Sequence, residues 1–307
     1  MREIAKKYLK EFDELEKKAC NEKKEFINGY SGKIENIYSE KRQDLFNELE
    51  NISFKSRVPK HENMLRKFEL MYFLLDETGY DYAKQMSSNI TGENKWKSEA
   101  KIRLFMMFVK RYYEAIYLLK GGLASSALDR VRGMYEIGVY LDIINKNSEG
   151  LAEKFLKHCN TSRLDLARSI SDQEMIQKIT EEINDFTDDY FYKKNNGWAK
   201  ELFPSTTRNI TFKNLVDITQ LKQFYYMYKT ACISAHATIL DSIQGIELDE
   251  KSRGKSVWVT GASENGIEYV LEILFSFSCI IIMDGLDNRN LSGMFTLLCF
   301  SNIMKNK

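Results

Sequence analysis

The sequence contains only two prolines, Pro59 and Pro204, among 307 residues. Proline ends or kinks a helix, so a chain with so few can run through long uninterrupted helices. Apolar residues recur at steps of three and four, the period of one helix face, and no stretch alternates apolar and polar residues as a half-buried strand does. Abundant Leu, Ile, Lys and Glu also favour helices. The sequence therefore predicts an all-α protein, a multi-helix bundle of about eight to ten helices with its core near 60–245.

The periodicity predicts a series of helices separated by short loops. Ser171 and Glu174 have the spacing of a capping box, which predicts that Ser171 caps the helix that follows it. The segment "DEKSRGKS" at 249–256 is predicted to be a charged linker. The expected helices are 61–88, 97–120, 123–146, 149–169, 171–194, 212–244, 263–284 and 291–304.

The same pattern predicts three parts of the chain. Residues 1–58 form a long amphipathic N-terminal helical arm, 59–250 a helical core domain, and 251–307 an apolar helical hairpin packed on the core. The arm has two interpretations: a solvated helix packed on the core, or a coiled-coil-like arm that mediates dimerisation. The arm and the apolar terminal helices together lead us to expect a homodimer.

Composition narrows the class of protein. Lys plus Arg number 45 and Asp plus Glu 44, a balance that argues against a general polyanion binder but allows a local basic patch. Five scattered cysteines without a CxxC pair are typical of reduced thiols, so we expect a cytoplasmic protein. The charged start of the chain predicts no signal peptide. The uncharged run 273–283 is too short to cross a bilayer, so we expect no membrane partner.

Sequence motifs for metals and cofactors are missing. Histidines 61, 158 and 236 lie far apart and form no HxxxH or HExxH pattern, and no P-loop, dinucleotide glycine motif or GxSxG elbow occurs. We therefore expect no metal and no cofactor.

The helix predicted over 123–146 is apolar or small at nearly every position, yet Asp129, Arg132 and Glu136 lie on one face of it. An arginine and a glutamate in such a helix must pair or face a wet cleft, because burying an unpaired charge costs too much. Two interpretations stay open. The pair fixes the register of the helix, or Arg132 binds an anion while Glu136 orients it.

His236 lies on the apolar stripe of the helix predicted over 212–244, with Cys232, Ile233, Ile239 and Leu240 as its helical neighbours. Desolvation there favours the neutral imidazole, which can act as a general base beside a cleft. The alternative is a core histidine bonded to a tyrosine or a backbone carbonyl.

Three stretches carry a family resemblance: "ALDRVRGMYEIGVYLDI" at 127–143, "NNGWAKELFPSTTRNITFKNLVDI" at 195–218 and "YKTACISAHAT" at 228–238. Together they resemble an uncharacterised bacterial all-helical family, catalogued as a domain of unknown function, over about 120–245. The residues that match its pattern are Arg132, Glu136, Trp198, Arg208, Ile210, Tyr228, Ser234 and His236.

A second resemblance is to the HEPN superfamily of helical, often dimeric proteins, many of which are metal-independent ribonucleases. Their site is an Arg and a later His that are separated by four to six residues. Here six residues separate Lys229 from His236, but lysine does not replace the bidentate guanidinium, which would have to come from Arg132. The resemblance implies RNA cleavage, phage defence or toxin activity, and a partner protein encoded nearby.

Two hypotheses of function follow. In the first, the protein is a metal-independent endoribonuclease. His236 transfers a proton, Arg132 stabilises the phosphate charge, Glu136 holds Arg132, and substrate is bound by Lys229, Tyr228, Ser234 and Arg208. In the second, it is a non-catalytic module for protein interaction or ligand sensing, and Arg132, Glu136 and His236 form a structural polar network.

Overall fold

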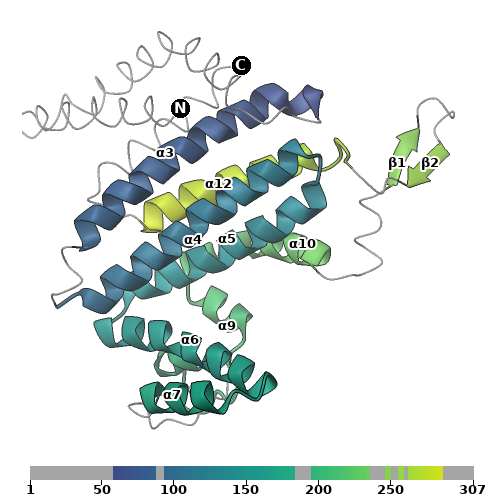
Figure 1. Ribbon diagram of the computed structural model, residues 1–307. Helices are drawn as coiled ribbons and strands as arrows, with labels where there is room; N and C mark the ends of the chain where they lie inside the picture. Colours follow the sequence, from purple (N-terminus) through teal and green to yellow (C-terminus); the bar gives the residue numbers. More distant parts are fainter. Residues whose placement is uncertain are drawn as a thin grey trace, which may run out of the picture. The chain divides into compact units, whose positions relative to one another are not determined.

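The computed structural model describes residues 58–87, 93–183, 195–235, 246–249, 255–258 and 262–285. These residues are overwhelmingly helical (Figure 1), which confirms the all-α fold. The helices and strands are η1 (Pro59–His61), α3 (Glu62–Ser87), α4 (Lys95–Lys120), α5 (Ala124–Lys146), α6 (Glu149–Ser169), α7 (Gln173–Ile183), η2 (Gly197–Leu202), α9 (Phe212–Asp217), η3 (Gln220–Phe224), α10 (Tyr225–Ala235), β1 (Ile246–Asp249), β2 (Lys255–Trp258) and α12 (Ile267–Gly285). None of the described helices is long and apolar enough to cross a membrane.

The described chain divides between two compact units. Among the described residues, those within 58–83, 105–138 and 226–285 belong to the first unit, and those within 84–104 and 139–225 belong to the second. The predicted arm, core domain and terminal hairpin stay predictions, because residues 1–57 and 286–307 lie outside the described residues.

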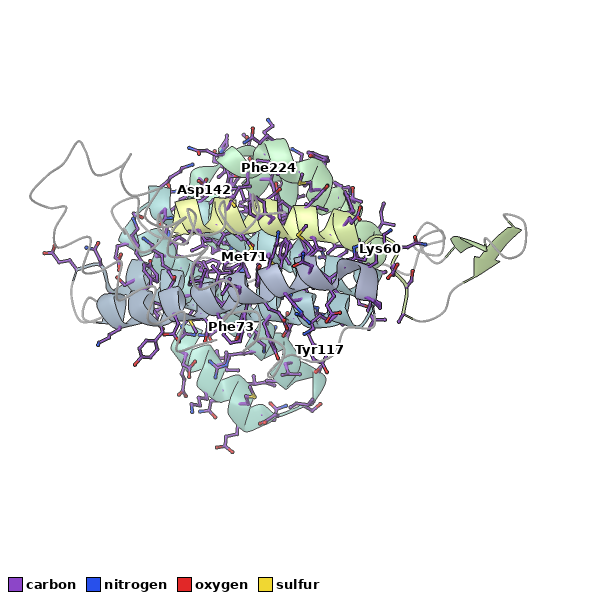
Figure 2. All side chains as sticks on the ribbon, turned by 90° about the horizontal axis from the view of Figure 1, so that it is seen from above. Lys60, Met71, Phe73, Tyr117, Asp142 and Phe224 are labelled. Carbon is purple, nitrogen blue, oxygen red and sulfur yellow. The ribbon has the colours of Figure 1, made fainter. Side chains whose placement is uncertain are left out.

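The first unit contains α10, α12, most of α3 and the adjoining parts of α4 and α5, which run side by side in Figure 1. Large side chains fill the space between them: Phe68, Met71, Leu75, Phe105, Phe108, Tyr112, Tyr135 and Phe277 are almost fully buried. Figure 2 shows Met71 of α3 among the packed side chains. The Tyr112 hydroxyl donates to the Phe68 carbonyl at 3.2 Å, so the polar end of a buried ring is satisfied.

Gly122 allows the tight turn between α4 and α5. Its φ of +75° lies in the left-handed region that favours glycine. Its carbonyl accepts a hydrogen bond of 2.9 Å from the amide of Ser263, just before α12, and a Cβ at Gly122 would lie 2.9 Å from that nitrogen. This turn therefore needs a glycine for both its backbone conformation and its close contact.

The second unit is held together by polar bonds at the start of α4 and by an aromatic cluster. The Glu149 carboxylate of α6 accepts from the backbone amides of Trp96 and Lys97, which are unpaired donors of the first turn of α4. Lys97 Nζ donates to the carbonyls of Asn145 and Asn147 at the end of α5. The aromatic cluster consists of Tyr140, Phe155, Trp198 and Phe212, with ring centroids 4.9 to 6.1 Å apart.

The long helix predicted over 212–244 is wrong in its first part. The chain forms the short helix α9, then η3, and only then α10, which is described as far as Ala235. The Thr219 hydroxyl and its backbone amide both donate to the Val216 carbonyl, which gives the chain a local alternative to helical hydrogen bonds. Residues 236–245 lie outside the described residues.

The capping box predicted at Ser171 is also wrong, by one residue. Asp172 caps α7, because its Oδ1 accepts from the Met175 amide at 2.9 Å. Ser171 instead ends α6 in the left-handed conformation, with φ +57°. The amides of Ser171 and Asp172 return to the carbonyls of Arg168 and Ala167, the two bonds of a Schellman motif.

One strand pair interrupts the helical fold. Where the sequence predicts a charged linker at 249–256, β1 and β2 pair antiparallel, with Ile246 opposite Trp258 and Asp249 opposite Lys255. Each strand is only four residues long, the lower limit at which alternation of apolar and polar residues indicates a strand, so the pattern did not stand out in the sequence.

Candidate functional site

The charged face of α5 carries the first part of the candidate site. Arg132 Nη2 lies 3.1 Å from Glu136 Oε1, and Arg132 Nη1 lies 3.8 Å from Asp129 Oδ1. The side chains of Arg132 and Glu136 are 27% and 28% exposed. The pair is therefore neither sealed in the core nor fully solvated, and the Arg132 side chain is part-exposed while its Nε is buried.

Tyr228 of α10 completes this cluster. Its hydroxyl donates to Glu136 Oε1 at 3.2 Å, the same oxygen that Arg132 binds. The Arg132 guanidinium carbon lies 5.9 Å from the centre of the Tyr228 ring, within range of a cation–π contact. The ring also packs on Tyr135 with centroids 5.1 Å apart. Glu136 and Tyr228 together hold Arg132 in one position.

The surroundings of the cluster raise the pKa values of both of its proton donors, the Arg132 guanidinium and the Tyr228 hydroxyl. Burial raises the pKa of Tyr228, and the negative charge of Glu136 raises it further, so the hydroxyl keeps its proton. Burial lowers the pKa of Arg132, but the hydrogen bond with Tyr228 and the charge of Glu136 outweigh that effect and raise it. Within the described residues the buried Nε of Arg132 has no hydrogen-bond partner.

A second group of charges flanks α5 on the side of α4. Arg130 bonds to Asp129 at 2.9 Å and lies 3.5 Å from Glu114 of α4. Arg111 of α4 lies against Gly133, where an added Cβ would come within 2.6 Å of the guanidinium carbon. Sequence reasoning missed Arg111. The one signal for it is Gly133, since glycine is costly inside a helix and usually marks a close approach.

The other four residues predicted for the site are not seen in the cluster of Arg132, Glu136 and Tyr228. Lys229 is exposed on α10. Ser234 belongs to the last turn of α10, but its side chain lies outside the described residues, as does the whole of His236. Arg208 belongs to the second unit, where it is exposed on the loop between η2 and α9. The structure therefore brings Arg132, Glu136 and Tyr228 together, and the use of the other four in a site stays a prediction.

The Trp198 and Ile210 positions of the family pattern serve the packing of the second unit. Trp198 is buried against Tyr140 and Phe155. The Ile210 carbonyl accepts from Asn196 Nδ2 at 2.8 Å, a bond that fixes the end of the loop that carries Arg208. Across the described ranges, no group of three or more His, Cys, Asp or Glu residues is placed to hold a metal ion.

Comparison with known families gives one match. The model of a family of unknown function, DUF5677, matches residues 99–253, just over half of the chain. The chain belongs to the DUF5677 family. This confirms the resemblance to an uncharacterised helical family, and the DUF5677 match contains every position of the pattern from Arg132 to His236. No curated protein and no solved structure matches the chain, and nothing in the comparisons points to the HEPN ribonucleases.

Proposed function

We propose that this DUF5677 protein is a metal-independent endoribonuclease whose phosphate-binding group is Arg132. The observation that carries the proposal is the Arg132 guanidinium, held by Glu136 and Tyr228 on a part-exposed face of α5. A fixed guanidinium aimed at developing charge stabilises a phosphoryl transition state without any reorganisation at the moment of reaction. Its raised pKa keeps it cationic at every physiological pH.

His236 supplies the proton transfer in this proposal. It follows directly after Ala235, the last residue of α10, which is the helix that carries Tyr228. The 2′-oxygen of the ribose forms a bond to phosphorus, and the bond from phosphorus to the 5′-oxygen breaks. His236 takes the proton of the 2′-hydroxyl, and the leaving 5′-oxygen receives a proton from solvent. The products are a 2′,3′-cyclic phosphate and a free 5′-hydroxyl.

Lys229, Ser234 and Arg208 contact the RNA in this proposal. Lys229 is exposed and directly follows Tyr228, the residue of α10 that contacts Arg132, and Arg208 is exposed on its loop. The role in phage defence or as a toxin, with a partner protein encoded nearby, belongs to the same proposal and rests on the HEPN resemblance.

The second candidate function is a non-catalytic interaction or ligand-sensing module. One observation favours it: the polar groups of the cluster already bond to one another, since Glu136 accepts from both Arg132 and Tyr228. Such a network can serve to fix the packing of α5 against α10. In that case Arg132 would affect stability and partner binding, and RNA would stay intact.

The test is incubation of the purified protein with mixed RNA, with and without a chelator. We expect cleavage in both conditions, with products that end in a cyclic phosphate. Arg132→Lys should lower the rate about 100-fold, because an ammonium does not replace the planar guanidinium. The matched control is Arg103→Lys, an exposed arginine of α4 that bonds to Glu99 over the same four-residue spacing and should cleave at the wild-type rate. Intact RNA in every sample, with folded protein, would support the non-catalytic function instead.

A further inference from the structure

The Arg111 guanidinium occupies the space that a side chain at position 133 would fill, so this position requires a glycine. A Cβ at Gly133 would come within 2.6 Å of both Arg111 Cζ and Nη1 and within 2.8 Å of Nε, all far shorter than real carbon contacts. The guanidinium therefore rests directly on the surface of α5. Gly133 costs helix stability at this interior position, and the close approach of Arg111 is what the missing side chain permits.

The acids of α4 and α5 that lie about one helical turn from Arg111 or Gly133 pair with other cations. Asp129 binds Arg130 and lies near Arg132, Glu114 lies within range of Arg130 and Lys110, and Glu136 binds Arg132. Arg111 makes no hydrogen bond or ion pair with any residue in the described part of the chain. Among the residues that the structure describes, these three carboxylates pair with Lys110, Arg130 and Arg132, and none of them pairs with Arg111.

The geometry of α5 puts Arg111 beside the candidate site. Gly133 lies four residues after Asp129 and three before Glu136, so all three share one face of the helix. Arg132 and Gly133 are adjacent in sequence, so their positions differ by about 1.5 Å along the helix axis. The Arg111 guanidinium, which lies against Gly133, and the point where the Arg132 side chain leaves α5 are therefore at the same level of the helix, on either side of the line from Asp129 to Glu136.

We propose that Arg111 and Arg132 together bind one phosphate group, and that Arg111 is a substrate-binding residue. Two guanidinium groups offer a phosphate more N–H donors than one, and guanidinium–phosphate bonds are among the stronger hydrogen bonds in proteins. The identity of the ligand, an RNA phosphodiester, rests on the proposed function. The binding of a phosphate group by two guanidinium groups is argued from the structure independently of that function.

The test is binding of a short oligoribonucleotide that carries 2′-O-methyl groups and so resists cleavage, measured by fluorescence anisotropy at fixed ionic strength. Arg111→Lys should weaken binding about 10-fold, since lysine keeps the charge and loses the planar fork. Gly133→Ala should weaken it similarly, because the new methyl group displaces the guanidinium. Its melting temperature should be unchanged or higher, since alanine favours helix over glycine and the displaced group is a flexible side-chain end. Arg103→Lys on the same helix should bind as the wild type does.

The outcomes separate this inference from the proposed function. Oligonucleotide binding that depends on Arg111 while unmodified RNA stays intact supports the inference and contradicts the ribonuclease. Cleavage and binding that are unchanged in both Arg111→Lys and Gly133→Ala overturn the inference and leave the ribonuclease standing. Inorganic phosphate should compete with the oligonucleotide. If inorganic phosphate raises the melting temperature of the wild type but no oligonucleotide binds, the phosphate group that the site binds does not come from RNA, and this part of the inference is overturned.

Discussion

At the scale of residues, Glu136 Oε1 is the atom on which the candidate site depends, because it accepts from both Arg132 and Tyr228. Tyr228→Phe removes one of these bonds and leaves the ring against Tyr135 in place. We expect a loss of about 1 kcal/mol in unfolding free energy, the usual contribution of one such hydrogen bond. RNA cleavage should also fall, because Arg132 is held less firmly. Tyr226→Phe, an exposed tyrosine of the same helix, is the control and should change neither quantity.

A second prediction at this scale concerns the thiol of Cys279 on α12. It should make the stability of the folded protein sensitive to alkaline pH. Burial raises the pKa of Cys279 from 9.0 to about 11. Between these values the unfolded chain loses the thiol proton while the folded protein keeps it, so stability is present below pH 9 and is lost as the pH rises towards 11. The loss should be at most about 3 kcal/mol, since one pKa unit corresponds to about 1.4 kcal/mol.

Urea unfolding of reduced protein across this pH range measures that loss. Cys279→Ala should flatten the decline between pH 9 and pH 11, and Cys159→Ala, an exposed thiol on α6, should leave it as in the wild type. A decline of equal size in Cys279→Ala would show that other groups cause it. The tyrosines Tyr112 and Tyr228, whose pKa values burial also raises, would then be the first to examine.

The parts of the site that sequence reasoning found are those set by local spacing. Arg132 and Glu136 lie four apart on one helix, so their contact follows from helix geometry. Tyr228 lies 92 positions from Glu136 along the chain, and only the family pattern pointed to it. Arg111 depends on how α4 packs against α5, which residue spacing within one helix does not encode. His236, which sequence reasoning placed at the centre, lies outside the described residues, so its role stays a prediction.

At the scale of elements, the junction between α6 and α7 stores a small backbone strain. Ser171 adopts φ +57°, a region that costs a residue with a side chain about 1 kcal/mol or more. Ser171→Gly should therefore raise the unfolding free energy by about 0.5–1 kcal/mol. Ser162→Gly, an exposed serine inside α6, should lower it by a similar amount, because glycine disfavours a helix interior. Thermal melts of the two variants beside the wild type test both signs, and a Ser171→Gly protein that melts lower would contradict the account of this junction.

Helix ends that local chemistry determines were predictable. The structure has α4, α5 and α6 within two residues of the predicted bounds, because few residues inside them oppose helix and Gly121, Gly122 and Ser148 mark their ends. The predictions failed where two local patterns compete. Ser171 and Asp172 both resemble caps, and the Schellman bonds of α6 decide for Asp172. The apolar stripe continues past Ile218, but Thr219 turns the chain there.

At the scale of the whole molecule, the self-association of the chain stays a prediction. Residues 1–52 carry an apolar stripe, and α4 exposes large apolar side chains in Met107, Tyr113 and Tyr117. We expect light scattering at micromolar concentration to give twice the 35.9 kDa mass of one chain. Replacing Leu45 and Leu49 of the stripe with glutamate should shift the mass towards the monomer, and Gln43→Glu should not. A monomer mass for the wild type would count against the dimer.

The central claim is that this protein cleaves RNA with Arg132 and His236, and the most direct measurement pairs activity with stability on one sample of His236→Ala. The variant and the wild type are melted and are incubated with RNA in the presence of a chelator. We expect cleavage to fall roughly 100- to 10,000-fold, the usual contribution of a general acid–base group, with little change in melting temperature. A His236→Ala protein that melts several degrees lower and cleaves RNA at the wild-type rate would contradict the claim.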